Sequence, residues 1–314
     1  MLRLVARRLL RVIPLLLLVT LIAFGLLNLV PGDPAVQIAG EFATAEQIEA
    51  VRTDLGLDQP WLARYGSWLG SAVQGDLGES LFSGVPVRTQ IWDRLPATVS
   101  LIGWALMLSA LIGIPAGTVA GWREGSAIDR FLTVGTTIGV AIPVFVSALV
   151  LALLVGLKLG WLPATGYVGI TESPWEWARR LILPSIALAF TGAAEIARQT
   201  RAGVIEVKKQ DFVRAARANG LTTWQVLGKH TLKNAMIPVV TVVGLQIGRL
   251  FGLSVLVEQI FNIPGLGSRL ITAVFENDIP FIQGTVLMLG TVIILVNAAI
   301  DISYGYFNPR VRES

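Results

Sequence analysis

Arg249, Gln246 and Glu258 are the polar residues of this sequence best placed to contact a solute inside a membrane. Arg249 lies near the middle of an apolar segment, residues 236–257, and Gln246 precedes it by about one helical turn. An ionised side chain within a bilayer is costly, so Arg249 must face a bundle interior, water or a partner. It could bind a substrate carboxylate there, or pair with an acidic side chain on another helix or another subunit; we favour the pairing. Glu258 follows the segment directly and is a third candidate for lining a pathway.

Composition excludes most catalytic chemistry. The chain has no cysteine and a single histidine, His230, so thiolate chemistry, disulfides and multi-histidine metal sites are ruled out. It also lacks the phosphate-binding pattern Gly-x-x-x-x-Gly-Lys-[Ser/Thr], so ATP and Mg would have to be bound by other chains. Asn297 and Asp301 are expected to be buried hydrogen-bonding partners rather than a proton relay. We therefore expect no catalytic residue, no metal site and no cofactor in this chain.

Two apolar segments carry glycine at every fourth position. These glycines are Gly113, Gly117 and Gly121 in residues 97–121, and Gly244, Gly248 and Gly252 in residues 236–257. Small residues repeated at this spacing line one side of a helix and let a neighbouring backbone approach closely. Glycine is also frequent in the chain as a whole, with 32 of 314 residues, but the strict register twice over favours helix packing.

A polar stretch, residues 198–235, separates two of the apolar segments and contains eight basic and two acidic residues. Its centre is typical of two short helices with a break at Gly220, because glycine tolerates the conformation that ends a helix. Thr222 and Gln225 then fit a capping box that starts the second helix. Such an elbow could dock on a soluble partner, or it could be a solvated basic loop. The candidate contact residues are Phe212, Arg214, Ala215, Ala216, Arg217, Gly220, Leu221 and Trp224.

Composition and charge predict an all-α integral membrane protein of one domain. Hydrophobic residues make up 54% of the chain and charged residues only 15%. Six apolar segments are long enough to span a bilayer, residues 12–30, 97–121, 131–157, 181–197, 236–257 and 281–306. The basic residues lie at the ends of these segments, so the positive net charge does not indicate nucleic-acid binding.

Loop charges predict the orientation. Arginines flank the first segment on its N-terminal side, and the stretch 198–235 is basic, so both are placed in the cytoplasm together with the C-terminus. Residues 31–96 contain nine acidic and four basic residues and are placed outside, as a helical insertion with an aromatic helix from about residue 61. The expected organisation is a first part, residues 1–30, an external part, residues 31–96, and a five-helix part, residues 97–314.

Several motifs resemble one known family. Ala215-Ala216-x-x-x-Gly220 is similar to the EAA loop of ABC importer permeases, although Arg214 stands where the general motif has Glu. The string DFVRAARANGLTTWQVLGKHTLKNAMIPVVT resembles the dipeptide, oligopeptide and nickel branch, in its first-permease type, with Lys233 where many relatives have Pro. The motifs PGDP at residues 31–34, E-Q-I-F-N-I-P-G-L-G at 258–267 and D-I-P at 278–280 extend the resemblance over essentially the whole chain.

The resemblance implies a type I ABC importer permease fold and a function. The chain would form half of a translocation pathway for di- or oligopeptides and would seat the elbow, as coupling helix, in a separate ATPase. Implied partners are a second homologous permease, two ATP-binding subunits, an extracytoplasmic substrate-binding protein and the lipid of a bacterial inner membrane. Relatives that import nickel, glutathione, haem or opines keep those substrates open.

Two other classes of protein fit less well. An ion-driven secondary transporter would need acidic residues deep in its spans and often an internal repeat, and only Asp301 was found to meet the first condition. A membrane enzyme would need a nucleophile with a base, or a metal cluster, and the sequence offers neither.

Overall fold

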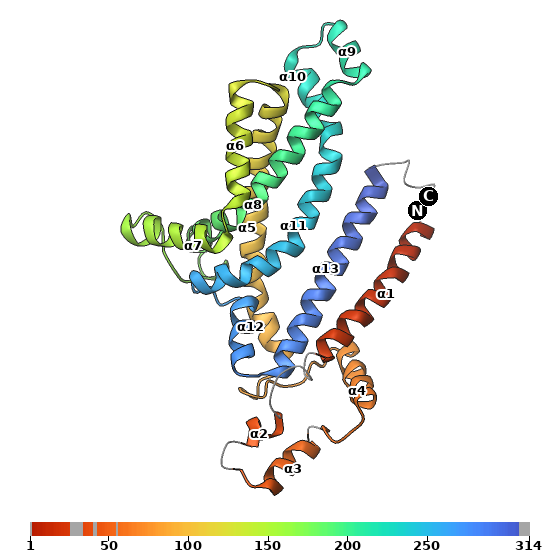
Figure 1. Cartoon of the computed structure of the whole chain (residues 1–314), viewed down its shortest axis with the longest axis vertical. Helices are drawn as coiled ribbons and strands as arrows, with labels where there is room; N and C mark the ends of the chain where they lie inside the picture. The colour runs from red at the N-terminus through yellow and green to blue at the C-terminus, as the bar shows by residue number, and fades with distance from the viewer. Residues whose placement is uncertain (1, 26–33, 40–42, 55, 308–314) are drawn as a thin grey trace. The chain divides into compact units, whose positions relative to one another are not determined.

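The computed structural model describes residues 2–25, 34–39, 43–54 and 56–307 of the chain. The described residues are mostly helical, as predicted, with one isolated β-bridge between Glu79 and Pro86 (Figure 1). The helices are α1 Leu2–Gly25, α2 Pro34–Ala39, α3 Ala45–Asp54, α4 Trp61–Val73, α5 Val87–Trp122, α6 Ala127–Ala141, α7 Val144–Leu151, α8 Pro174–Lys208, α9 Asp211–Ala218, α10 Thr223–Gln225, α11 Lys233–Ile260, α12 Leu266–Phe275 and α13 Ile279–Phe307, with π-helical segments at Ala152–Lys158 and Val226–Leu232.

These helices fall into two compact units. The first unit comprises Met1–Val5, Ala97–Ser268 and Val296–Ser314, and the second comprises Ala6–Pro96 and Arg269–Leu295. This division cuts across the three parts expected from sequence, because residues 269–295 join the segment 6–96 rather than the rest of 97–314. Residues 269–295 contact the segment 6–96 directly: Arg269 donates to Gln90, and a β-carbon added at Gly290 would meet the side chain of Val19.

Four helices have the length and apolar character of a membrane span: Val87–Trp122, Pro174–Lys208, Thr223–Ile260 and Ile279–Ile300. They coincide with the second, fourth, fifth and sixth segments predicted. The first predicted span corresponds to α1, whose apolar part Val12–Gly25 is short, and residues 26–30 of that prediction lie outside the described residues. The motif at residues 31–33 and the C-terminal arginines also lie outside them, as does the side chain of Asp301.

The third predicted span, residues 131–157, is not one straight helix. α6 ends at Ala141, and the next helical piece, Val144–Lys158, is bent from it by 96°, so that α7 turns aside from α6 in Figure 1. Pro143 explains the break, because its ring excludes the helical conformation for the preceding residue. Ile142 is accordingly extended, with φ −79° and ψ 121°.

The polar stretch 198–235 is less of a loop than predicted, because α8 continues through it to Lys208. Two polar contacts hold this extension. Arg201 forms a bidentate pair with Asp129 of α6, at 2.6 and 2.8 Å, and the Lys208 ammonium donates to the carbonyl of Trp122 at 3.1 Å. The apolar span therefore ends well before the helix does, and only the part after Lys208 forms the elbow.

α8 is the centre of the first unit and packs against α6, α7 and α11. α5 also lies against it, as its glycine stripe predicts. A β-carbon added at Gly113 would lie 2.6 Å from the Ala193 carbonyl oxygen, and one at Gly121 would lie 2.8 Å from that of Arg201. Gly117 faces the Ala197 carbonyl even more closely. The prediction of a close helix contact is confirmed for all three.

The second stripe fits its prediction only in part. Gly244 is buried, and an added β-carbon there would overlap the side chain of Ile300 on α13. Gly252 instead has nothing within 4 Å of an added β-carbon. The prediction of a close contact is therefore wrong for this residue within the described chain. A glycine at this spacing makes a close contact only where another helix faces it, and none of the described residues faces Gly252. Gly248 is half-buried, and its predicted helix contact stays a prediction.

In the second unit the predicted aromatic helix packs on α1. Phe24 is the centre of this cluster, with the rings of Trp61, Tyr65 and Trp68 each 5.6 Å from its own. The Tyr65 hydroxyl also lies 2.8 Å from that of Thr20. The insertion is therefore attached to the first helix by the aromatic face of α4.

Candidate functional sites

The predicted partner of Arg249 is Glu195, which lies on α8. One terminal nitrogen of Arg249, Nη1, donates to both carboxylate oxygens of Glu195, at 2.6 and 2.7 Å. The side-chain amide of Gln246 donates to Oε2 of the same carboxylate at 2.8 Å. The expectation that Arg249 pairs with an acid on another helix is confirmed. Glu195 itself was missed, although an acidic residue inside the apolar segment 181–197 was a visible signal.

The three members of this cluster differ in how far they are covered. Gln246 is only 4% exposed, whereas the side chain of Glu195 is 21% and that of Arg249 60% exposed. Arg249 belongs to an open stripe of α11 that also contains Leu245, Gly252 and Leu256. The buried amide of Gln246 thus holds the Glu195 carboxylate in place, and the Arg249 guanidinium is exposed on the surface of the first unit.

Glu258 is placed differently from Arg249 and Gln246. It is fully buried, and its carboxylate accepts from the Thr98 hydroxyl at 2.7 Å and from the backbone N–H of Ser268 at 2.8 Å. The second contact places a carboxylate at the start of α12, where free N–H groups and the helix dipole favour negative charge. Glu258 therefore closes the turn between α11 and α12 rather than presenting a surface to a solute.

The Pro-Gly-Leu-Gly sequence after Glu258 is explained by the same carboxylate. A β-carbon at Gly265 would collide with it, and one at Gly267 would lie 2.9 Å from Oε2. Positive φ does not account for these glycines, because the residue with positive φ in this turn is Asn262, at 50°. The glycines are needed for the close approach of the Glu258 side chain.

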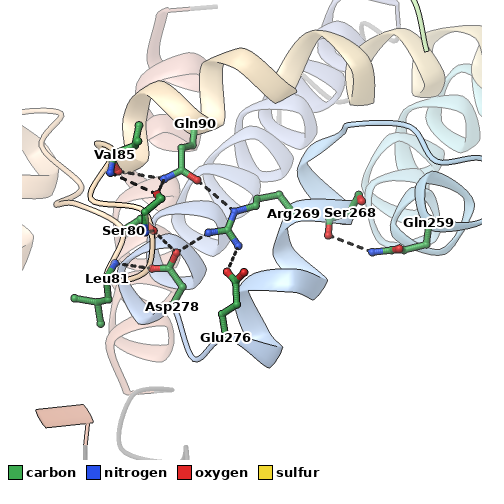
Figure 2. A network of polar contacts seen from close by, with 10 residues as sticks. Ser80, Leu81, Val85, Gln90, Gln259, Ser268, Arg269, Glu276 and Asp278 are labelled. Carbon is green, nitrogen blue, oxygen red and sulfur yellow. Dashed lines mark hydrogen bonds and ion pairs between the residues drawn. The ribbon is translucent and has the colours of Figure 1, made fainter. Parts of the chain in front are cut away.

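A buried arginine organises the second unit. Arg269 donates to Glu276 at 2.8 Å, to Asp278 at 2.7 Å and to Gln90 at 3.3 Å, as Figure 2 shows. Its guanidinium also lies 4.7 Å from the ring centroid of Phe281.

Asp278 extends this network to the segment before α5. Its carboxylate accepts from the Ser80 hydroxyl at 2.5 Å and from the backbone N–H of Leu81 at 3.2 Å (Figure 2). Residues 278–280 were expected only as a family motif, and the pairing of Asp278 with Arg269 was not predicted. The network ties the segment around Ser80 to the turn between α12 and α13.

The elbow has the local structure that the sequence predicted. α9 ends at Ala218, Gly220 has φ +76°, and the Thr222–Gln225 capping box is present with both of its hydrogen bonds. A positive φ suits glycine because other residues bring a β-carbon against the backbone there. The chain therefore reverses at Gly220 at little cost.

One of the candidate contact residues lies on the buried side of the elbow. Val213 and Ala216 are buried together with Val226, and Trp122 and Val207 pack against them. Ala216 is thus part of the elbow's own core rather than a contact for a partner. The predicted contact role of Ala216 does not fit this burial, whereas Phe212 and Ala215 lie on the exposed side of α9.

The other candidate contact residues remain accessible. Trp224 is 81% exposed, and Phe212, Ala215 and Leu221 are exposed as well. Of the two arginines, Arg214 pairs with Asp211 at 3.2 Å, while Arg217 lies over the ring of Trp122, 5.1 Å from its centroid. The elbow therefore presents an aromatic and basic outer surface on a small apolar core.

Family comparisons agree with this arrangement. Residues 113–313 match the family described as binding-protein-dependent transport system inner membrane component, and residues 1–102 match its N-terminal component. The dipeptide transport system permease protein DppB of Alkalihalophilus pseudofirmus is 38% identical over 326 residues, covering 98% of each chain. The glutathione transport system permease protein GsiC of Escherichia coli is 41% identical over 313 residues, covering 99% of each.

A solved structure supports the fold. A chain of the MetNI methionine ABC transporter, in an inward-facing conformation, superimposes with a TM-score of 0.57 and 19% identity, covering 70% of this chain and 96% of its own. At that identity the likeness concerns the fold alone. With the family match over most of its length, the multi-span helical fold and full-length relatives named as permeases, this chain belongs to the binding-protein-dependent transport system inner membrane components, the permease subunits of ABC importers.

Proposed function

We propose that this chain is one of two permease subunits of an ATP-driven importer of small peptides. The observation that carries the substrate class is the match, over 98–99% of the chain, to proteins named for dipeptide and glutathione transport. Glutathione is itself a tripeptide, so both names indicate short peptides. Nickel, haem and opines remain the alternative substrates of the same machinery.

The partners follow from this function. A second, homologous permease completes the pathway, two ATP-binding subunits supply the energy, and a binding protein outside the bacterial inner membrane delivers the peptide. The basic elbow and both termini face the cytoplasm in this proposal, because Lys and Arg near a span resist translocation. Residues 31–96, with their excess of acidic side chains, face the opposite side.

Single cysteines test the orientation. Glu49 and Lys209 are suitable positions, since their side chains are 67% and 64% exposed. A membrane-impermeant thiol reagent added to intact cells is expected to label the cysteine at position 49 and to reach position 209 only after the membrane is opened. Labelling of both in intact cells would contradict the proposed topology.

The elbow is proposed to transmit ATP hydrolysis to the permease. Its exposed residues, Phe212, Ala215, Leu221 and Trp224, would seat in the ATPase subunit, and Gly220 holds the two short helices at their angle. Arg214 lies at the edge, where an exposed ion pair contributes only about 0–1 kcal/mol. The shape of the elbow should therefore matter more than any one of its charges.

Gly220→Val tests this role, with Gly220→Asn as its matched control. Valine is strongly disfavoured at φ +76°, whereas asparagine tolerates positive φ. In vesicles containing all subunits, the valine variant is expected to lose most of the ATP hydrolysis stimulated by loaded binding protein, and the asparagine variant to keep it. Capture of peptide by the binding protein should be unchanged. Normal stimulation in a fully assembled valine variant would favour the solvated-loop alternative.

The substrate class is tested in the same vesicles. Uptake of a labelled dipeptide and of labelled glutathione is measured with ATP inside and the cognate binding protein outside. Import of either one supports the proposal. Failure to import both, in vesicles whose ATPase responds to another ligand of the binding protein, would contradict it.

A further inference from the structure

We propose that the Glu195–Arg249 pair is a binding site for the two charged ends of a zwitterionic peptide on its way through the membrane. The carboxylate of the peptide would bind Arg249, and its ammonium group would bind Glu195. This inference rests on the proposed import of peptides and names residues that would contact the substrate inside the permease. It is carried by the depth, the exposure and the hydrogen bonding of the pair.

Arg249 lies well inside its candidate membrane span. Arg249 follows the start of α11, at Lys233, by a helical rise of about 24 Å and precedes its end, at Ile260, by about 16 Å. Glu195 lies within α8, another candidate span. Arg249 is thus farther from either end of α11 than its own side chain can reach, so its charge stays within the bilayer thickness.

The exposure of the pair excludes lipid as its surroundings. Arg249 is 60% exposed, on a stripe of α11 with Leu245, Gly252 and Leu256. Charged groups within a bilayer face a bundle interior or a water-filled cavity, because hydrocarbon solvates them poorly. This stripe therefore faces a pathway or a second subunit. The small residue Gly252, with open space beside it, leaves room next to the guanidinium.

The hydrogen bonds leave the two charges able to accept a ligand. Within the described residues, Nη1 of Arg249 makes both bonds to Glu195, so Nε and Nη2 remain as donors for a carboxylate. A guanidinium binds a carboxylate best through two parallel bonds. Glu195 is held independently by the buried amide of Gln246 and keeps its position when Arg249 turns toward a ligand. Three bonds occupy its carboxylate, which has about four acceptor positions.

The charges of the site match one kind of solute. The pair is neutral as a whole, with one cation and one anion side by side, and a peptide with free termini carries the same two charges in the opposite sense. When the Glu195–Arg249 pair opens, Arg249 pairs with the peptide carboxylate and Glu195 with its ammonium group. Every charge therefore keeps a partner while the peptide passes. A peptide that lacks one terminal charge would leave either Arg249 or Glu195 without a substitute partner.

The test compares a peptide with its C-terminal amide, which lacks the carboxylate but has the same side chains. Both are loaded onto the binding protein at saturation, checked by calorimetry, and uptake into vesicles of the complete importer is expressed per captured peptide. The wild-type importer is expected to prefer the free acid. Arg249→Gln should reduce uptake of the free acid by about tenfold, which corresponds to about 1.4 kcal/mol, and change uptake of the amide by less than about twofold.

Three further variants complete the design. Glu195→Gln is expected to remove the preference for a free over an acetylated N-terminus. Arg249→Lys keeps the charge and should retain most of the preference for the free acid, which tests the proposal even where the glutamine variant fails to assemble. Arg130→Gln removes an exposed arginine from α6 and should leave both ratios unchanged.

The outcomes separate this inference from the proposed function. Equal loss of free-acid and amide uptake in Arg249→Gln would show that the pair only holds the helices, and would overturn the inference while peptide import stands. A wild-type importer that takes up both forms equally well would also overturn it. Failure of the wild type to import any peptide would overturn the proposed function, and the inference with it.

Discussion

Gly113, Gly117 and Gly121 of α5 lie against the backbone of α8, whereas Gly252, at the end of the same pattern on α11, has open space beside it. An ion pair anchored on α8 accompanies each stripe. Arg201, whose carbonyl faces Gly121, binds an Asp129 side chain that is only 5% exposed, while the Arg249 side chain near Gly252 is 60% exposed. The first region is closed within the chain, and the second is open to something outside it.

The difference separates two uses of the same residue types. On α5 glycine admits a neighbouring helix, and the ion pair at its end fixes the extension of α8 beyond the apolar span. On α11 glycine leaves space, and the ion pair keeps donors free. Substitutions in the closed region, at the α5 glycines or the Asp129–Arg201 pair, should strongly lower the stability of the isolated chain. Substitutions in the open region of α11, at Gly252 or the Glu195–Arg249 pair, should have their effects mainly in the assembled importer.

The largest effect is expected from Gly117→Leu. The added side chain would meet the Ala197 backbone, which cannot move as a side chain can, so the cost should reach or exceed the roughly 1–3 kcal/mol typical of overpacking. The matched control is Gly103→Leu on the same helix, because Gly103 has open space. Yield and Tm of the detergent-solubilised chain are the measurements. Equal behaviour of the two variants would mean that the α5–α8 contact is not tight.

An intermediate effect is expected from Asp129→Asn. It leaves the Arg201 guanidinium without its counterion and removes a charge-assisted bond to the Gly125 N–H, at an expected cost of about 1–3 kcal/mol because Arg201 is one-third exposed. Glu195→Gln should cost less than about 1 kcal/mol in the isolated chain, since its partner is mostly exposed. Thermal unfolding of both variants checks the order, and a reversed order would erase the distinction between the two regions.

The smallest effect is expected from Gly252→Ala, and its sign is informative. Alanine is the better helix former by about 0.5–1 kcal/mol, so with open space beside it the substitution should leave the isolated chain unchanged or slightly more stable. Gly113→Ala, which brings a β-carbon to 2.6 Å from a carbonyl oxygen, should lower Tm. A lower Tm for Gly252→Ala in the isolated chain would contradict the open space beside this residue.

Local features of the fold were predictable because their causes are local. The capping box at Thr222 and Gln225 and the break at Gly220 depend on residues within a few positions of each other. The caps of α3, with Thr44 and Gln47, were predictable for the same reason. Apolar length alone located the four long spans. Pro143 in the sequence accounts for a break between α6 and α7, but the 96° size of the bend depends on how α7 packs against α8 and α11.

Partners distant in sequence were not predictable. Nothing near Arg249 indicates Glu195, 54 residues away, and nothing near Arg269 indicates Gln90. The inward face of α9 was missed because apolar residues lie on both sides of so short a helix, and only the contact with Val226 and Trp122 selects Val213 and Ala216. Glu258 was read as exposed to a pathway, since its sequence shows a charge and not the N–H groups of α12 that bind it.

The sequence by itself determined that the chain is helical, crosses a membrane several times, carries a basic elbow and has no means of binding ATP through a phosphate loop. These properties follow from composition, charge and near-neighbour chemistry. The tertiary structure decided which charges are paired, which glycines are covered and which face of α11 stays open. Those properties depend on contacts between helices far apart in the chain, where packing and the poor solvation of charge in a bilayer select one partner among several.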